Sequence, residues 1–530
     1  MYTETVDVIV IGSGNAGFSA AASAKEQGAR SVVLLEKSPQ SWAGGNSTFT
    51  AGAYRTVFYG LRDVLSLPVH NVTPEMVDLI DIQPYLEKDF MNDLMRLTNG
   101  RCDPKLAEKL VKESNETTKW LSRNGIRFCL SFNRQSYNID GRHKFWGGMV
   151  LAVEGGGKGL IRQHQSNAKK LGVDVRYDSP VVRLRTDERG VVTGVTVRKK
   201  DGSTYDIKAV GGVIMCAGGF EANPEMRAQY LGPNWDLAYV RGTPYNTGDL
   251  LKMAINEVGA RPAGNWSGCH STCWDFNAPT DAGNRIATNQ HTKSGYPLGL
   301  MFNVDGLRFV DEGEDMRNYT YAKLGRAILQ QSSGVAFQIW DSDGESWLRK
   351  EEYADDVVEK ILANSIEELG GKLQAKGMQS PQKFVDSIKE YNAAVQGFRR
   401  EHPNAKFDPS RKDGLSTRSS SGGLSMGPDK TNWALPIVKG HFLAIKITCG
   451  ITFTFGGLKT DADTAGVISQ ITDEPISGLY VAGEMVGGLF YGNYPGGSGL
   501  TQGAVFGRTA GREAAGRAKT LSLVEVSARL

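Results

Sequence analysis

The feature that most constrains the fold is a glycine-rich turn near the N-terminus, Gly12-Ser13-Gly14-Asn15-Ala16-Gly17. It follows the apolar run VDVIVI at residues 6–11, which is typical of a buried parallel strand. An alanine-rich segment that ends at Gly28 comes next and is typical of a helix. The following strand pattern, SVVLLEK, contains Glu36, about 20 residues after the turn. This order of strand, turn, helix, strand and acid predicts a dinucleotide-binding unit.

Each glycine of the turn has a physical role in that prediction. Gly12 makes the tight turn, Gly14 lets the backbone approach a pyrophosphate, and Gly17 allows close packing of helix and strand. The N–H groups at the start of the helix face the anion. Glu36 would accept hydrogen bonds from ribose hydroxyls, which disfavours a 2′-phosphate. The turn alone does not separate NAD from FAD.

Later segments favour FAD. Small residues at 43–47 and 50–52 suit a chain that runs along an extended cofactor, and the strand patterns at 213–220 and 478–484 both end in glycines. Near the C-terminus, NYPGGSGLTQGAVFGR at 493–508 is a second glycine-rich turn that leads into a helix. The first turn already accounts for the pyrophosphate. We therefore predict that N–H groups of residues 498–501 stabilise negative charge near flavin N1 and O2.

Composition narrows the class of partner. The chain has 530 residues, with 61 Lys and Arg against 58 Asp and Glu, and no long run of one sign. This balance gives no electrostatic case for nucleic acid or a membrane surface, so we expect a small-molecule substrate. The six cysteines are scattered without a C-x-x-C pair, which argues against a zinc site or a disulfide framework. We expect no metal.

The termini bear on localisation. The N-terminus lacks a basic leader and enters a strand pattern at once, and no apolar run approaches the roughly 18 residues of a membrane span. We therefore expect a soluble, unprocessed, cytoplasmic protein without membrane insertion. The ending Ala528-Arg529-Leu530 matches the small-basic-leucine peroxisomal address, which applies only if the source is a eukaryote.

From end to end, the chain resembles the fumarate reductase/succinate dehydrogenase flavoprotein family. The resemblance rests on several motifs in the same order: the N-terminal turn, GGNS (44–47), CAGGF (216–220) with Glu221 and Asn223, NTGD (246–249), RFVDE (308–312), TFGGLKTD (454–461), and VAGE (481–484) with the glycine turn after it. Within the family, residues 309–326 and 493–508 look most like the tricarballylate dehydrogenase group.

The resemblance implies an α/β fold: a Rossmann-like FAD-binding domain of the GR2 flavoprotein type, split in sequence, with an inserted α+β capping domain that is mobile. The sequence is compatible with FAD-binding parts at 1–262 and 441–530 and a cap at 263–440. Residues 345–400 have helical patterns, and Ser365 with Glu368 forms a capping box. The stretch 411–430 is polar, glycine-rich and loop-like.

The turns and the resemblance together predict the residues that hold the cofactor. They are Gly12, Gly14, Asn15, Ala16, Gly17, Glu36, Lys37, Gly44, Gly45, Asn46, Ser47, Ala51, Gly52, Val182, Ala217, Gly218, Asn246, Asp249, Gly483, Glu484, Ser498, Gly499, Leu500 and Thr501. Some family members attach FAD through a histidine. The resemblance puts Asn46 at that position, and residues 38–53 contain no histidine, so we predict non-covalent FAD.

The chemistry requires a hydride exchange with flavin N5 and a proton transfer at the adjacent carbon. The resemblance places the family's proton-transfer arginine at Arg317, although the interval after RFVDE is one residue longer here. A guanidinium stays protonated, so Arg317 suits an acid or a clamp better than a base. For dehydrogenation, acids at 311–315 would relay a proton, or Tyr319 or Tyr321 would act directly. The alternative is a surface arginine paired with a neighbouring acid.

Other positions bear on the substrate. His270 in GCHSTCWD resembles the family's His-Pro-Thr segment in the substrate pocket, with a structural histidine as the alternative. Fumarate reductases carry a substrate-binding histidine where this chain has Phe453 and a carboxylate-binding arginine where it has Tyr494. With Tyr491, these form an aromatic wall that disfavours simple fumarate reduction. His143, in a basic stretch with Arg142, is a further carboxylate anchor or part of an exposed loop.

The leading hypothesis is an FAD-dependent oxidoreductase that acts on CH–CH groups and forms, or reduces, a C=C bond next to a carboxylate or carbonyl, as in the tricarballylate dehydrogenase group. One alternative is an enoate reductase fed by an external donor, and another is a 3-ketosteroid dehydrogenase-like desaturase. An electron-transferring flavoprotein without an organic substrate is the alternative outside enzymes. The sequence has no haem-binding or iron–sulfur cysteine motif. Electrons would therefore pass to or from a separate protein or dioxygen.

Overall fold

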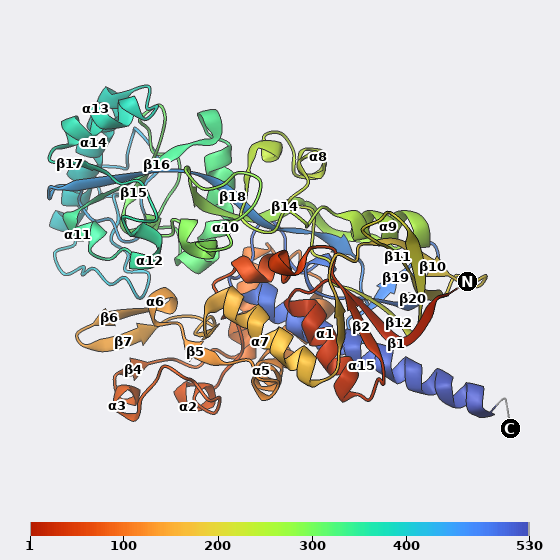
Figure 1. Cartoon of the computed structure of the whole chain (residues 1–530). Helices are drawn as coiled ribbons and strands as arrows, with labels where there is room; N and C mark the ends of the chain where they lie inside the picture. The colour runs from red at the N-terminus through yellow and green to blue at the C-terminus, as the bar shows by residue number, and fades with distance from the viewer. Residues whose placement is uncertain (1, 528–530) are drawn as a thin grey trace. The chain divides into compact units, whose positions relative to one another are not determined.

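The computed structural model describes residues 2–527, which divide into two compact units (Figure 1). Within the described residues, unit 1 combines residues 2–232, Gly242–Cys269 and 453–527, and unit 2 combines Pro233–Arg241 and His270–Thr452. The predicted domain limits, after residue 262 and before residue 441, fall at or near the starts of strands β14 (Pro262–Asp275) and β18 (Phe442–Leu458). Both strands run from one unit into the other.

The main sheet of unit 1 is built around β1 (Glu4–Ile11), whose last six residues are buried. β1 lies parallel to β2 (Val32–Leu35) on one side and to β12 (Thr204–Met215) on the other. This arrangement confirms the predicted Rossmann-like start, although the second strand is shorter than its sequence pattern. The other strands of this sheet are β9 (Asp174–Arg176), β10 (Val181–Thr186), β11 (Val192–Arg198), β19 (Gly466–Ile468) and β20 (Pro475–Val481).

In unit 1, a helix from the N-terminal part of the chain packs against a helix from the C-terminal part. Helix α1 (Asn15–Glu26) follows the first glycine turn, and α15 (Ser498–Ser527) begins where the second glycine turn predicts (Figure 1). Glycines on α15 let the two helices approach closely. A Cβ on Gly507 would lie 2.5 Å from the Ala16 carbonyl oxygen, and one on Gly511 would lie 2.2 Å from that of Ala20. The helix contact therefore brings both glycine turns into one region.

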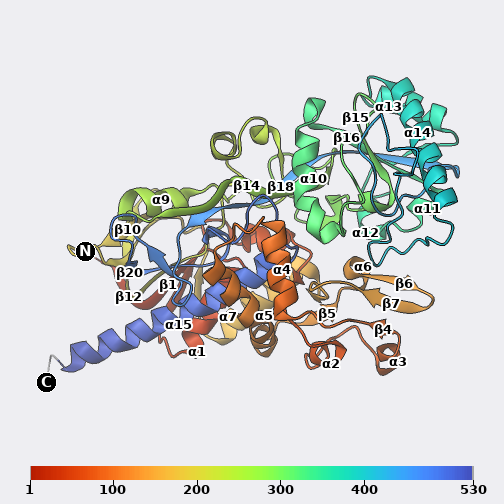
Figure 2. The same ribbon diagram turned by 180° about the vertical axis from the view of Figure 1, so that it is seen from behind.

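The rest of unit 1 is helices and two small sheets. Helix α5 (Pro104–Arg123) lies against α15, where the Arg508 guanidinium carbon is 5.3 Å from the ring centroid of Trp120 (Figure 2). The small sheets consist of β3 (Ala53–Tyr54), β8 (Leu151–Val153) and β5 (Phe128–Leu130), and of β4 (Ile80–Asp81), β7 (Arg142–Phe145) and β6 (Ser136–Ile139). The remaining helices are α2 (Leu61–Val64), α3 (Pro74–Val77), α4 (Glu87–Leu97), α6 (Phe132–Gln135), α7 (Gly156–Lys170), α8 (Pro224–Met226) and α9 (Asp249–Val258).

Unit 2 has the α+β character predicted for the cap. β16 (Ala336–Asp341) pairs antiparallel with β15 (Leu300–Asn303) and with β18, and β17 (Ile361–Ala363) also pairs with β18. β18 further pairs with β13 (Tyr239–Val240) and β14. The helices are α10 (Arg317–Leu329), α11 (Ser342–Glu345), α12 (Lys350–Tyr353), α13 (Ile366–Ala375) and α14 (Pro381–Glu401).

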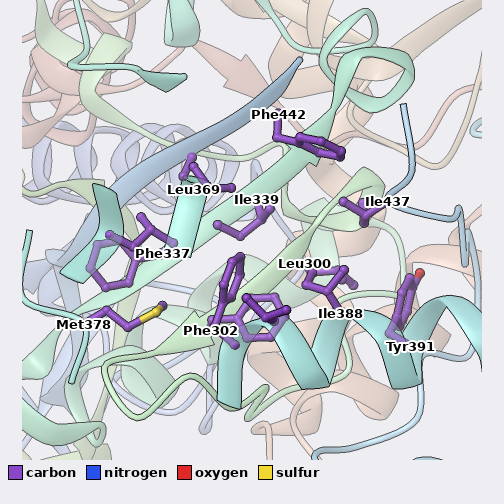
Figure 3. Packing of buried hydrophobic residues seen from close by; sticks show 14 of the residues in the cluster. Leu300, Phe302, Phe337, Ile339, Leu369, Met378, Ile388, Tyr391, Ile437 and Phe442 are labelled. Atoms are coloured by element: carbon purple, nitrogen blue, oxygen red, sulfur yellow. The ribbon is translucent and has the colours of Figure 1, made fainter. Parts of the chain in front are cut away.

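The core of unit 2 forms where α13 and α14 cover this sheet. Figure 3 shows Phe302, Phe337 and Ile339 from the strands beside Leu369 and Ile388 from the helices, and all five are fully buried. Each such side chain contributes about 1.5–3 kcal/mol through burial. The predicted start of α13 is confirmed, because Ser365 Oγ accepts a hydrogen bond from the Glu368 backbone N–H at 3.1 Å.

Some features bear on the composition-based expectations. Within residues 2–527, the structure contains no helix that is both long and apolar enough to cross a membrane. All six cysteines are free thiols. The predicted peroxisomal ending, residues 528–530, lies outside the described part of the chain.

Candidate active site

The first glycine turn has the backbone that its sequence predicts. Gly12 adopts φ +103°, and a Cβ there would lie 2.3 Å from the Cys216 carbonyl oxygen. Both the conformation and the space therefore exclude larger side chains. A Cβ on Gly14, by contrast, would meet nothing closer than Ser47 Oγ at 3.5 Å. This open backbone at the start of α1 fits the phosphates of a dinucleotide.

Glu36 is held beside this turn. Its Oε2 accepts hydrogen bonds from the backbone N–H of Ser13 at 3.0 Å and from Ser13 Oγ at 2.6 Å, and its Oε1 accepts one from the Ser38 N–H at 2.8 Å. A carboxylate has about four acceptor sites, so one remains for a ribose hydroxyl. Lys37 and Asp249, two other predicted cofactor residues, form an ion pair at 2.7 Å.

Asn15 connects three of the predicted cofactor segments. Its Nδ2 donates to the Leu500 carbonyl oxygen at 2.8 Å, its backbone N–H donates to Ser47 Oγ at 3.1 Å, and its Oδ1 accepts from Tyr54 Oη at 2.7 Å. His164 Nε2 lies 3.1 Å from the same Oδ1, and burial lowers the pKa of His164 to about 3. A neutral imidazole therefore donates to Asn15, and the two glycine turns are tied together.

The other predicted cofactor residues also lie in unit 1. The short helical turn Gly45–Phe49 carries Asn46 and Ser47, and Val182 lies on β10 at the edge of the main sheet. Ala217 and Gly218 follow β12, while Gly483 and Glu484 follow β20, its parallel neighbour. Because parallel strands end at the same edge of a sheet, these four residues gather at one edge, where such folds bind their ligands.

A buried acid, Glu221, and a partly buried acid, Glu484, lie at this edge. Glu221 Oε1 accepts hydrogen bonds from Asn46 Nδ2 at 2.5 Å and from Asn246 Nδ2 at 2.6 Å. Glu484 Oε1 accepts from the backbone N–H of Thr454 at 2.7 Å and from its Oγ1 at 3.1 Å. Burial and the neighbouring charge of Glu484 both raise the pKa of Glu221 well above its ordinary value. Glu221 was not among the predicted site residues.

Aromatic side chains gather at the start of α15. The ring centroid of Tyr494 lies 5.1 Å from that of Phe453, 5.3 Å from Phe490 and 6.0 Å from Phe455. A Cβ on Gly499 would meet only Phe453, at 3.8 Å, so the cluster borders the second glycine turn. Phe455 and Phe490 join the predicted wall. Tyr491 lies near Asp103. Burial raises the pKa of the Tyr491 phenol, and the charge of Asp103 raises it further.

A buried arginine supports the second glycine turn. Arg55 is fully buried, and its Nε donates to the Gly496 carbonyl oxygen at 2.8 Å. Its Nη1 donates to Tyr85 Oη at 2.9 Å and to Asp93 Oδ2 at 3.1 Å. Sequence reasoning missed Arg55, because no local pattern marks an arginine whose partners lie elsewhere in the chain.

In unit 2, His270 is buried on β14 and its ring lies 4.9 Å from that of Tyr321. Burial and the positive charge of Arg241 both lower the pKa of His270 well below its ordinary value. Arg241 is itself buried, donates to Thr452 Oγ1 at 2.8 Å, and lies with its guanidinium carbon 5.6 Å from the ring centroid of Trp274. The result is a neutral histidine beside a cation. Arg241 was also not among the residues predicted from the sequence.

Arg317 is the first residue of α10. A cation there opposes the helix macrodipole, so Arg317 does not serve the stability of the helix. Its carbonyl oxygen accepts a hydrogen bond from Tyr296 Oη at 3.3 Å. Tyr319 is buried on the same helix, and Tyr321 of α10 makes the contact with His270.

The four candidate relay acids have other partners. Asp311 accepts hydrogen bonds from the backbone N–H and Oγ1 of Thr431 at 3.1 and 2.7 Å, and Glu314 pairs with Lys323. Glu312 is buried, pairs with Arg308 at 2.5 Å, and accepts from the Met301 N–H at 2.7 Å. Asp315 Oδ1 accepts a hydrogen bond from the Met316 N–H at 2.8 Å, at the start of α10.

His143 lies in the small sheet of unit 1 on β7. Its ring is 4.7 Å from that of Phe132 in an edge-on contact. The neighbouring Arg142 contacts Asp81 with two nitrogens, at 2.9 and 2.5 Å. Arg142 of the basic stretch is therefore paired with an acid of the same sheet.

Comparison with known proteins places these features in context. A family model described as an FAD binding domain matches residues 7–73 and 76–500. The chain is 27% identical to fumarate reductase (cytochrome) of Shewanella frigidimarina, over 97% of this chain and 77% of the relative. It is 25% identical to 4-oxocyclohex-2-ene-1-carboxylate 5-dehydrogenase of Sinomonas cyclohexanicum, over 99% of this chain and 98% of the relative.

Among solved structures, the open conformation of a flavocytochrome c3 fumarate reductase is similar to this chain. The TM-score is 0.70 at 26% identity, and the match covers 98% of this chain and 79% of that one.

Proposed function

Because the chain belongs to the FAD-binding flavoprotein family that includes the fumarate reductases, we propose that it is a dehydrogenase that forms a C=C bond next to a carboxylate or carbonyl, as tricarballylate dehydrogenases do. The chain is an FAD-dependent oxidoreductase that acts on CH–CH groups. FAD, when bound, supplies the exchange of a hydride with a substrate carbon. The residues of this chain bind and orient the substrate and move the accompanying proton.

The aromatic cluster at the second glycine turn carries the proposed direction. Phe453 and Tyr494 are in ring contact with each other, 5.1 Å apart, at the positions where the resemblance implies the substrate-binding histidine and arginine of fumarate reductases. An arginine that binds a carboxylate provides a charge-assisted contact of about 1.5–3 kcal/mol, which this wall does not supply. The wall suits a larger or less charged substrate. A relative named as a dehydrogenase of an oxocyclohexene carboxylate supports the same direction.

We assign the polar roles to unit 2. His270 is neutral at physiological pH because its pKa is lowered, so it serves as a hydrogen-bonding partner of the substrate rather than as a cation. The buried guanidinium of Arg241 supplies positive charge beside it, suited to a substrate carboxylate. Dehydrogenation removes a hydride from one carbon and a proton from its neighbour. That proton passes by way of Arg317 to one of the acids at 311–315, or the phenol of Tyr319 acts on it directly.

FAD is held without a covalent bond in this proposal. The side chain at the implied attachment position is Asn46, whose Nδ2 donates to Glu221 and whose Oδ1 accepts from the Thr243 N–H at 2.8 Å. An amide nitrogen is a poor nucleophile because its lone pair is delocalised. Denaturing the protein in acid should release all flavin into the supernatant. Yellow colour that stays with the precipitated polypeptide would refute this assignment.

The substrate class is tested by anaerobic mixing of the purified flavoprotein with tricarballylate, succinate, a cyclic keto acid and a 3-ketosteroid. We expect tricarballylate or the keto acid to bleach the flavin absorbance, and succinate to do so far more slowly. Bleaching by succinate alone would contradict the role of the aromatic wall. Bleaching by the steroid alone would indicate that the substrate is large and apolar.

A second candidate is an enoate reductase fed by an external electron donor, because the similar protein from Shewanella frigidimarina is a fumarate reductase. A guanidinium such as Arg317 is a better proton donor than base, which suits reduction. In either direction, a separate protein or dioxygen would exchange the electrons. Rapid reoxidation of the reduced flavoprotein by an enoate, with no bleaching by any saturated acid or ketone, would favour this candidate.

A further inference from the structure

Glu221 and Glu484 form a carboxyl pair within unit 1. Glu221 lies six residues after the end of β12 and Glu484 lies three after the end of β20, and these strands are parallel neighbours. The two carboxyl groups are near enough for the charge of Glu484 to raise the pKa of Glu221, in addition to the larger effect of burial. Glu221 is fully buried, whereas Glu484 retains part of its accessible surface. Gly219 makes room for the pair, because a Cβ there would lie 2.1 Å from Glu484 Oε1.

The donors around the pair are unevenly distributed. Glu221 Oε1 accepts from two asparagine amides, Asn46 and Asn246, and Glu484 Oε1 accepts from Thr454. Glu221 Oε2, in contrast, is buried and has no donor within hydrogen-bond distance. The nearby Glu484 carboxyl group, when ionised, only accepts hydrogen bonds. A buried carboxylate oxygen that has no donor and lies near a second carboxylate favours protonation of one of the two groups.

A charged residue lies close to Glu221 in the chain. Arg227, on the segment after α8, donates its Nη1 to the Glu221 carbonyl oxygen at 2.6 Å. The side chains that donate to the two carboxyl groups, Asn46, Asn246 and Thr454, are uncharged. Burial raises the pKa of Glu221, and repulsion by the charge of Glu484 raises it further.

We propose that Glu221 is a protonated carboxylic acid at neutral pH, that its Oε2–H donates to Glu484, and that the singly protonated pair positions Asn46 for the cofactor. With the proton on Oε2, Oε1 is a carbonyl-type acceptor for the Asn46 and Asn246 amides. Asn46 is then fixed with its Nδ2 toward Glu221 and its Oδ1 toward the Thr243 N–H. Glu484, which is partly exposed, carries the negative charge of the pair. Glu221 is thus a positioning residue that acts through Asn46.

Infrared difference spectroscopy on the holoprotein at neutral pH tests the protonation state. Glu221→Gln should remove a carbonyl stretching band that belongs to a carboxylic acid and shifts in D₂O, while the flavin carbonyl bands cancel in the difference. Glu352→Gln is the matched control, because Glu352 is equally buried but paired with Arg349 at 2.8 Å and is therefore ionised. Loss of the band in Glu352→Gln, or its persistence in Glu221→Gln, would overturn the proposal.

Binding of FAD to the apoprotein provides a second readout. Gln is the neutral isostere of a protonated glutamate and keeps both the donor and the acceptor, so Glu221→Gln should bind FAD within about threefold of the wild type. Glu221→Leu removes the acceptor of the Asn46 and Asn246 amides and the proposed donor to Glu484, and should weaken binding by about tenfold or more. A Gln variant as impaired as the Leu variant would show that the native residue is ionised, against the proposal.

Discussion

The two glycine turns of unit 1 keep their shape by different means. The backbone of the first is determined locally, since Gly12 adopts φ +103° and its strand and helix adjoin it in sequence. The second depends on Arg55, which is 441 positions from its acceptor Gly496. Thr501 Oγ1 also donates to the Arg55 carbonyl oxygen, at 2.7 Å. A turn of the first kind can be recognised in a sequence, whereas support of the second kind is visible only in the fold.

Of these variants, Gly12→Ala should lower the unfolding free energy most, since it alters the first glycine turn. The positive φ costs about 1–2 kcal/mol, and the clash with backbone adds about 1–3 kcal/mol, so we expect destabilisation of roughly 2–5 kcal/mol and loss of bound FAD. Urea unfolding and the ratio of flavin to protein absorbance measure both. Gly45→Ala is the control, because φ is +52° there but nothing lies within 4 Å of its Cβ. Equal losses in both variants would contradict the packing part of this account.

Arg55→Met should weaken the second turn. It leaves the Asp93 carboxylate, the Tyr85 hydroxyl and the Gly496 carbonyl without this donor, and breaking a buried ion pair costs about 3–5 kcal/mol. Because Asp93 is partly exposed and also pairs with Arg96, we expect a value at or below the lower end, about 3 kcal/mol. The comparison is Arg142→Met, which removes a more exposed pair with Asp81 and should cost under about 1 kcal/mol. Similar unfolding free energies for both variants would show that the buried Arg55 pair contributes no more to stability than the exposed Arg142 pair.

The tie between the turns should respond to pH. Burial lowers the pKa of His164 to about 3, so the unfolded chain, with an ordinary value of 6.5, binds the proton more readily than the folded one. The stabilising contribution of His164 is therefore complete above pH 6.5 and decreases as pH falls toward 3, by up to about 1.4 kcal/mol per pH unit. Unfolding free energies at pH 7 and 5.5 measure this slope. His164→Gln should reduce it, and an unchanged slope would reject the assignment.

Arg317→Ala should have the smallest effect on stability while lowering turnover about 10²–10⁴-fold. Removing a cation from the positive end of α10 is neutral or stabilising by about 0.3–1 kcal/mol. Arg326→Ala, in the last turn of the same helix, should do the reverse and cost stability without lowering turnover. Thermal unfolding and steady-state kinetics separate the two. Full turnover in Arg317→Ala would favour a flavoprotein without this proton-transfer group.

Sequence reasoning succeeded where a pattern is local. The turn at Gly12, the cap at Ser365 and the start of α15 depend on adjacent residues, and all three are confirmed. It did not find Arg55 or Arg241, and it named Glu221 only as part of a motif, because the role of each depends on partners that only the fold brings close. A buried arginine or glutamate looks like a surface residue in a single sequence. The aromatic wall was found in part, through Phe453 and Tyr494, while Phe455 and Phe490 joined it through packing alone.

The central claim is that an aromatic wall, in place of the charged fumarate-binding pair, favours formation of a C=C bond. Stopped-flow absorbance under anaerobic conditions can measure both directions in one preparation of the wild-type flavoprotein. We predict that tricarballylate or a cyclic keto acid reduces the flavin faster than fumarate reoxidises the reduced form. Rapid reoxidation by fumarate, without any reduction by the saturated acid or ketone, would contradict the account.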